Sequence, residues 1–237
     1  MGEFTHTLEK TRFMEAILRW IVTYGCKLGL EILCDIKKEN WDAVPPAGPL
    51  IAYANHTGMV EAPLIFTQLQ PRKSTGLAKI ETWDIKFLAW VFNLWGIIPI
   101  HRGEADMEAL RKCLDALEKG LILGMSPEGT RSKNGALLRA HGGIALLALK
   151  SGAPLQPIGQ WGSQHFGANV KKIKRTKVNL KVGRVFYLDA RGERVSKEIR
   201  QQMADEMMYQ LAALLPEELR GEYSDLENAT EKYLRFV

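Results

Sequence analysis

Short apolar runs alternate with helix-period segments along residues 50–214 of this chain. The runs are too short for typical helices, and several are rich in β-branched and aromatic residues, which favours strands. Strands that alternate with helices are typical of a mostly parallel sheet covered by helices. We therefore expect an α/β fold: a mixed, largely parallel sheet flanked by helices, with an N-terminal amphipathic helical segment.

The expected strands are the apolar runs themselves: Leu50–Ala54, Thr75–Lys79, Gly96–Ile100, Leu121–Met125, Leu155–Gly159 and Val178–Leu188. The expected helices repeat apolar residues every three or four positions: 11–33, 60–69, 84–94, 104–119, 141–151 and 195–214. The proline-rich connection Trp41–Pro49 cannot continue a helix and is the expected boundary. We therefore divide the chain into a helical segment, residues 1–40, and an α/β domain, residues 41–237.

Composition limits the class of protein. Apolar residues make up 46% and charged residues 25%, as in ordinary globular domains. The formal net charge of +5 favours anionic partners such as phosphorylated substrates or lipid surfaces. The basic run 171–177 lacks interleaved aromatic residues, so we expect no nucleic-acid partner. Cys26, Cys34 and Cys113 lack C-x-x-C spacing and no His/Cys cluster has metal-ligand spacing, which predicts reduced core cysteines and no metal site.

The apolar stretch at 11–33 is interrupted by charge. Arg19 and Lys27 leave only seven uncharged residues from Trp20 to Cys26, whereas a membrane-spanning helix needs about 20 apolar residues. Tryptophan beside basic residues suits a helix that lies in a membrane interface. An amphipathic helix packed on the domain core is an equal alternative. The N-terminus shows no signal-peptide pattern.

Residues 87–100 contain no charge, and the helix expected at their start is apolar nearly all round. Such a helix is usually buried in protein, and we expect burial here. The alternatives are the wall of an apolar ligand groove and a segment that dips into a membrane.

A histidine and a glutamate follow the first apolar strand. His56 comes just after Leu50–Ala54, where α/β folds place ligands, and Glu61 comes five residues later. An imidazole oriented by a carboxylate can accept a proton from a hydroxyl. On a regular helix the two would be about 500° apart, so they can meet only if His56 lies in a turn before the helix. A histidine that caps a helix is the alternative.

Cations follow three other strands. Pro127–Ser132 comes after Leu121–Met125; there Arg131 can bind a phosphate bidentately and Gly129 lets main-chain N–H groups approach an anion. Arg102 and Lys79 follow two more strands. Each cation alone is an ordinary surface residue, but together they predict an anion-binding rim at one edge of the sheet.

These residues resemble the glycerolipid acyltransferase family, whose type members are 1-acyl-sn-glycerol-3-phosphate acyltransferases. Four ordered blocks within about 50–160 carry the resemblance: N-H-x-x-x-x-D at Asn55–Glu61, G-x-x-x-I-x-R at Gly96–Arg102, P-E-G-T-R-S at Pro127–Ser132 and a proline-containing strand at Ala153–Ile158. Lys79 and Glu81 resemble a K-x-E element between the first two blocks. Two departures stand out: Glu61 replaces the family's aspartate, and His141 lies where the family has a bulky residue and a lysine.

The resemblance implies direct acyl transfer without an acyl-enzyme, a cofactor or a metal. His56 would be the general base and Glu61 its partner. The implied acceptor-binding residues are Lys79, Arg102, Glu128, Gly129, Thr130 and Arg131. The implied partners are lysophosphatidic acid as acceptor, acyl-CoA or acyl carrier protein as donor, and an anionic membrane surface. The implied location is the cytoplasmic face of the cell membrane, in a peripheral or monotopic arrangement.

Other functions compete with this interpretation. Another lysophospholipid or a glycolipid can be the acceptor for the same base. A serine or cysteine hydrolase is disfavoured because no G-x-S-x-G motif occurs. A non-catalytic lipid-binding protein is conceivable because of Glu61, although the intact Pro127–Ser132 block argues against loss of activity.

Overall fold

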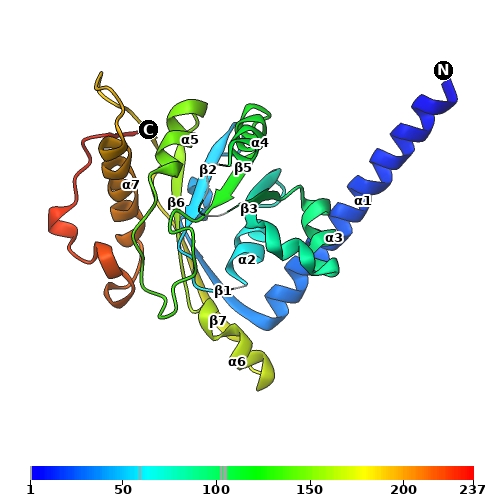
Figure 1. Cartoon of the computed structure of the whole chain (residues 1–237). Coiled ribbons are helices and arrows are strands. Elements are labelled where there is room, and N and C mark those ends of the chain that lie inside the picture. Colours follow the sequence, from blue (N-terminus) through cyan, green and yellow to red (C-terminus); the bar gives the residue numbers. More distant parts are fainter. Residues whose placement is uncertain (1, 59, 102, 104–105) are drawn as a thin grey trace.

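A computed structural model describes residues 2–58, 60–101, 103 and 106–237, with side chains from residue 13 onward. Within these residues the strands are β1 (Cys34–Glu39), β2 (Leu50–Ala54), β3 (Ser74–Lys79), β4 (Ile98–Ile100), β5 (Ile122–Met125), β6 (Leu155–Trp161), β7 (Thr176–Val182), β8 (Phe186–Leu188) and β9 (Leu234–Phe236). The helices are α1 (Gly2–Leu33), α2 (Glu61–Gln68), α3 (Lys86–Trp95), α4 (Met107–Glu118), α5 (Gly143–Ser151), α6 (Phe166–Lys171) and α7 (Lys197–Ala212). The predicted α/β class is confirmed (Figure 1).

The sheet is mixed and mostly parallel. Its strand order is β1-β7-β6-β2-β5-β3-β4, and β8 joins β6 to β9 at the side. Strands β6, β2, β5, β3 and β4 all run parallel, whereas β7 is antiparallel to β6 and β1 is parallel to β7. The carboxyl ends of the five parallel strands therefore lie at one edge, and β1 and β7 begin at that same edge.

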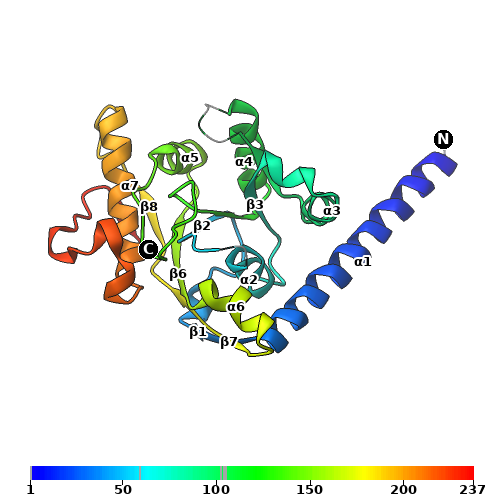
Figure 2. The same ribbon diagram turned by 60° about the horizontal axis from the view of Figure 1, so that its bottom comes forward.

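Strand β2 is apolar along its whole length because both of its faces are covered. Ile51 and Tyr53 pack into the core beneath α4, α5 and α7, while Leu50 and Ala52 belong to the core on the opposite face. The Tyr53 hydroxyl donates to the Met207 carbonyl oxygen at 2.8 Å, which satisfies a polar group in a fully buried position. Figures 1 and 2 show the two helical layers, with α2 and α3 on the side opposite α5 and α7.

Two boundaries differ from the sequence-based expectation. The helix expected at 11–33 ends at Leu33 as expected, but residues 34–39, which we assigned to the helical segment 1–40, form the edge strand β1. The apolar pattern of the sequence did not predict β1, because its residues are mostly charged and an edge strand at the surface needs few apolar side chains. The single strand expected at 178–188 is two strands, β7 and β8, which both pair antiparallel with β6 and are separated by a short break at 183–185, where Gly183 packs on the Pro157 ring.

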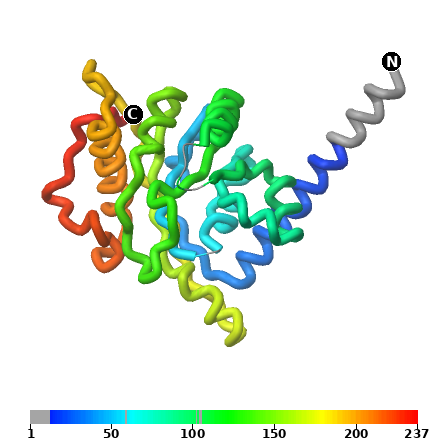
Figure 3. Tube along the Cα trace, viewed as in Figure 1, coloured from blue at the N-terminus to red at the C-terminus, as the bar shows by residue number. Residues whose placement is uncertain are grey.

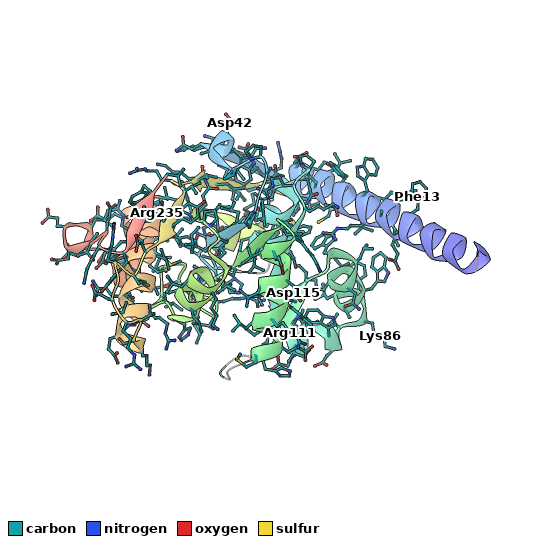
Figure 4. The ribbon with its side chains drawn as sticks, turned by 90° about the horizontal axis from the view of Figure 1, so that it is seen from above. Phe13, Asp42, Lys86, Arg111, Asp115 and Arg235 are labelled. Carbon is teal, nitrogen blue, oxygen red and sulfur yellow. The ribbon has the colours of Figure 1, made fainter. Side chains whose placement is uncertain are left out.

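Helices α1 and α3 leave apolar side chains in solvent. α1 extends away from the domain (Figures 1 and 3), and Figure 4 shows Phe13 on it and Lys86 at the start of the neighbouring α3. The expectation that α3 is buried all round is wrong: Val91 and Trp95 are buried, but Phe87 is 68% exposed. The exposed large apolar residues of the two helices and the turn before α3 are Phe13, Met14, Ile17, Leu18, Trp20, Ile21, Leu28, Ile32, Leu33, Ile85, Phe87 and Trp90. Among the described helices, none is long and apolar enough to cross a membrane.

The C-terminal tail holds the loop that follows β5. Leu137 N donates to Leu219 O at 2.9 Å, and Glu222 N donates to Leu137 O at 3.2 Å. Gly221 lies between these bonds at φ +50°, and a Cβ there would be 2.1 Å from Leu137 O. Only glycine fits this close approach of two main chains.

We expect Gly221→Ala to lower the free energy of unfolding by about 3–4 kcal/mol, because it adds a clash with Leu137 to the strain of positive φ. Gly192→Ala is the matched control: Gly192 has φ +80° and no atom within 4 Å of an added Cβ, so its loss should be about 1 kcal/mol. Urea unfolding followed by circular dichroism measures both. Equal losses of unfolding free energy in the two variants would show that the clash with Leu137 adds nothing to the cost of a side chain at position 221.

Candidate active site

A partly buried His56 and a buried Glu61 form a pair at the carboxyl end of β2. His56 lies in the loop before α2, and Glu61 is the first residue of that helix, which is the arrangement that the five-residue spacing requires. The imidazole Nδ1 is hydrogen-bonded to Glu61 Oε1. Among the described residues, Nε2 has no hydrogen-bond partner. The pair thus has the form of an oriented base with one ring nitrogen open.

Glu61 lies in a nearly closed environment at the start of α2. Its side chain is 4% exposed and lies in the first turn of α2, where the helix dipole favours negative charge. The second oxygen, Oε2, is buried without a hydrogen-bond partner among the described residues. A Cβ at position 58 would lie 3.4 Å from this oxygen, in ordinary van der Waals contact.

Glu128 fixes the main chain that carries His56. Its Oε1 accepts a hydrogen bond from His56 N at 2.8 Å, and its Oε2 accepts one from Leu138 N at 2.9 Å. Burial raises the pKa of the Glu128 carboxyl, and these two N–H bonds oppose that rise. Ser132 N also donates to His56 O at 2.8 Å. The Pro127–Ser132 loop therefore holds both main-chain polar groups of His56.

A second polar network holds the other side of the same turn. Asn55 exchanges two hydrogen bonds with the main chain of Gln160, at 2.8 and 3.0 Å. The Gln160 side chain donates to Thr57 Oγ1 at 2.7 Å and accepts from Ser163 Oγ at 2.7 Å. The sequence analysis missed Gln160 and Ser163. The one signal in the sequence that could have predicted these two residues is their polar character at the end of the apolar strand β6.

The cations of the expected anion-binding rim differ in whether they already form an ion pair. Lys79 ends β3 and pairs with Glu81 at 2.8 Å, with both side chains about half exposed, so the pair is weak and easily exchanged for another anion. Thr130 and Arg131 are exposed, and within the described part of the chain Arg131 makes no ion pair. Arg102 lies outside the described residues.

Gly129 is required by the shape of its loop. It has φ +64°, and a Cβ there would lie 3.0 Å from the His141 ring. His141 N in turn donates to Pro127 O at 2.9 Å.

Among the described residues, no three His, Cys, Asp or Glu side chains gather as ligands for a metal ion.

The placement of these groups defines a chemistry. Because β2, β5 and β3 are parallel neighbours, His56, the Pro127–Ser132 loop and Lys79 all lie at one edge of the sheet. A base beside exposed cations can deprotonate the hydroxyl of a bound anionic molecule.

Comparison with known proteins finds relatives that are named as acyltransferases. The chain is 30% identical over 118 residues to the chloroplastic 1-acyl-sn-glycerol-3-phosphate acyltransferase LPAT1 of Arabidopsis thaliana, covering 48% of this chain and 32% of that protein. It is 29% identical over 114 residues to the lyso-ornithine lipid O-acyltransferase of Pseudomonas aeruginosa, covering 48% and 43%. The match thus spans about a third of the plant relative's length.

The fold also has a solved counterpart. The crystal structure of the 1-acyl-sn-glycerophosphate (LPA) acyltransferase PlsC from Thermotoga maritima superposes with a TM-score of 0.62 at 24% identity, covering 83% of this chain and 79% of that one. The sequence profile described as Acyltransferase matches residues 35–161, which run from β1 to the end of β6 and include every site residue described above except Ser163. On this match, the chain belongs to the acyltransferase family.

Proposed function

We propose that the protein transfers a fatty acyl group from a thioester to the free hydroxyl of 1-acyl-sn-glycerol-3-phosphate, giving phosphatidic acid. The observation that carries the proposal is the bond from His56 Nδ1 to the buried Glu61, which leaves Nε2 open for a proton. The relatives named as 1-acyl-sn-glycerol-3-phosphate acyltransferases support this acceptor.

The reaction needs one proton transfer in each direction. His56 Nε2 takes the proton of the acceptor hydroxyl while that oxygen attacks the thioester carbonyl carbon. Glu61 stabilises the imidazolium that forms. The tetrahedral intermediate then breaks its C–S bond, and the imidazolium returns the proton to the departing thiolate. The products are an ester and a free thiol, and neither an acyl-enzyme nor a cofactor takes part.

Arg131, Lys79 and Thr130 would hold the acceptor phosphate. Arg131 is exposed and unpaired within the described residues, and its planar guanidinium matches two phosphate oxygens. Glu128 has a different role from the acceptor binding that the resemblance implies. Its two carboxylate oxygens already accept main-chain N–H bonds, so we assign it to the positioning of His56. Arg102 remains an expected phosphate ligand.

A second lysolipid is the alternative acceptor. The relative named lyso-ornithine lipid O-acyltransferase, 29% identical over 114 residues, favours this candidate. The base and its partner would be the same, and the acceptor headgroup alone would differ. For either acceptor, the donor is an acyl-CoA or an acyl carrier protein thioester.

A membrane surface would supply the acceptor. The exposed apolar residues of α1 and the neighbouring α3 form a surface that water solvates poorly, and several are aromatic. Amphipathic helices of this kind lie at the boundary of headgroups and acyl chains. We therefore propose that the protein binds a membrane peripherally, on the cytoplasmic face of the cell membrane that the family resemblance implies.

We expect His56→Ala to lower kcat about 1,000-fold, because the reaction loses its base. We expect Glu61→Asp to lower kcat about 100-fold, because the shorter side chain moves the carboxylate about 1 Å away from Nδ1. Thiol release from oleoyl-CoA, with and without lysophosphatidic acid, measures both. Release without an acceptor would indicate a hydrolase, and a faster Glu61→Asp enzyme would show that glutamate is a handicap.

Two variants separate positioning from phosphate binding. Glu128→Gln replaces one acceptor oxygen by a donor, so we expect kcat to fall about 100-fold with little change in the acceptor KM. Arg131→Ala should instead raise the acceptor KM about tenfold or more. Glu118→Gln, an exposed glutamate at the end of α4, is the control. An effect of Glu128→Gln on the acceptor KM alone would assign Glu128 to the acceptor after all.

The membrane proposal has its own test. Replacing Trp20 and Phe87 together by serine removes two exposed aromatic side chains, so we expect binding to phosphatidylcholine vesicles to fall at least tenfold. Sedimentation with vesicles measures this binding. Unchanged sedimentation would exclude the α1 and α3 surface as the membrane contact.

A further inference from the structure

The turn between α6 and β7 concentrates the positive charge of the chain. Seven lysine and arginine residues and no acidic residue lie between positions 162 and 188. This segment therefore more than accounts for the formal net charge of +5. We call residues 171–177 the basic tip.

Most of the basic tip is not used to hold the fold. Arg175 is engaged, since its guanidinium donates to the Glu31 and Cys34 carbonyl oxygens. Lys171, Lys172 and Lys174 are exposed, and among the described residues no carboxylate lies within ion-pair distance of them. Unpaired cations gathered in this way are available to an anionic partner.

The exposure and the backbone conformation of Ile173 are not explained if the turn is simply a solvated one. It is 98% exposed and has lysines on both sides. Its φ is +52°, a conformation that is unfavourable for a β-branched side chain and that asparagine or glycine adopts more easily. Two main-chain bonds close the turn around it, from Ile173 N to Val170 O and from Lys174 N to Asn169 O. A strained, fully exposed isoleucine indicates an apolar contact outside the molecule.

The topology brings the basic tip to the edge of the sheet that carries His56. β6 ends at this edge, and Ser163 there donates to Gln160, which holds Thr57. β7 runs back from the tip, and β1 runs beside β7 in the same direction. The carboxyl end of α1 therefore also lies here, as Figures 1 and 2 show next to α6.

We propose that the basic tip is a second membrane contact, in which Ile173 enters the headgroup layer and Lys171, Lys172 and Lys174 bind anionic lipid phosphates. This inference rests on the proposed function, because it needs an enzyme that works at a lipid surface. The isoleucine favours a membrane over an acyl-CoA or an acidic carrier protein, since phosphates alone need no exposed apolar side chain. The tip would bring the edge that carries His56 close to the headgroups.

The test compares binding to vesicles of phosphatidylcholine and to vesicles of phosphatidylcholine and phosphatidylglycerol in equal parts. Replacing Lys171, Lys172 and Lys174 by glutamine should weaken binding to the anionic vesicles about fivefold per lysine, on the order of 100-fold together. Binding to phosphatidylcholine through α1 and α3 should stay. The matched control replaces Lys73, Lys119 and Lys150 by glutamine; these exposed lysines precede β3, β5 and β6 at the opposite edge.

Ile173→Asn separates the apolar contact from the charge. It should weaken binding to the anionic vesicles about tenfold, while relief of strain raises the thermal unfolding midpoint by about 2–4 °C. A lower midpoint would mean that Ile173 stabilises the folded chain, and would overturn the proposal.

Three other results would also overturn it. One is equal binding of the wild type to both kinds of vesicle. Another is equal loss of binding in the control triple variant. The third is a higher KM for oleoyl-CoA with unchanged vesicle binding, which would assign the tip to the donor. Vesicle binding is measured without substrates, so a lack of acyl transfer would refute the proposed function while leaving this result readable.

Discussion

The buried carboxylate of Glu128 is the interaction on which the site depends. One of its oxygens accepts from His56 N and the other from Leu138 N, so a single side chain joins the end of β2 to the loop after β5. The loop segment at Leu137 is bonded in turn to Leu219 and Glu222 of the C-terminal tail. The position of the base is thus set by parts of the chain that are about 70 to 165 residues away from it.

This arrangement has a cost in stability. Burial raises the pKa of Glu128 despite the two N–H bonds, so desolvation of the charge outweighs them. A carboxyl whose pKa is higher in the folded state binds its proton more tightly when folded. Its contribution to stability is therefore complete below the unfolded pKa and is lost as the pH rises through the folded pKa. Both Glu128 oxygens accept a main-chain N–H bond, an arrangement that an ionised carboxylate satisfies in full.

The sequence predicts those features that depend on burial pattern and chain order. Strand β2 can be predicted because both of its faces are covered, so all of its residues are apolar. The five-residue spacing of His56 and Glu61 allows contact only if His56 precedes the helix, which is the geometry of the structure. Strand β1 escaped because charged residues are tolerated at a sheet edge. The exposure of Phe87 was not predicted, because helical periodicity shows which residues share a face of a helix and does not show what covers that face. The bonds of Glu128 and Gln160 join distant segments, and no local pattern encodes them.

The direction of two strands explains why one edge can serve both chemistry and a lipid surface. Had β7 run parallel to β6, the basic tip and the end of α1 would lie at the edge opposite His56. The antiparallel step at β7, followed by the parallel β1, instead returns both of them to the edge where β2, β5 and β3 end. A lysophospholipid keeps its acyl chain in the membrane while its hydroxyl reacts at the headgroup level. An enzyme for it therefore needs its base and its membrane contacts on the same side, and this topology supplies that arrangement.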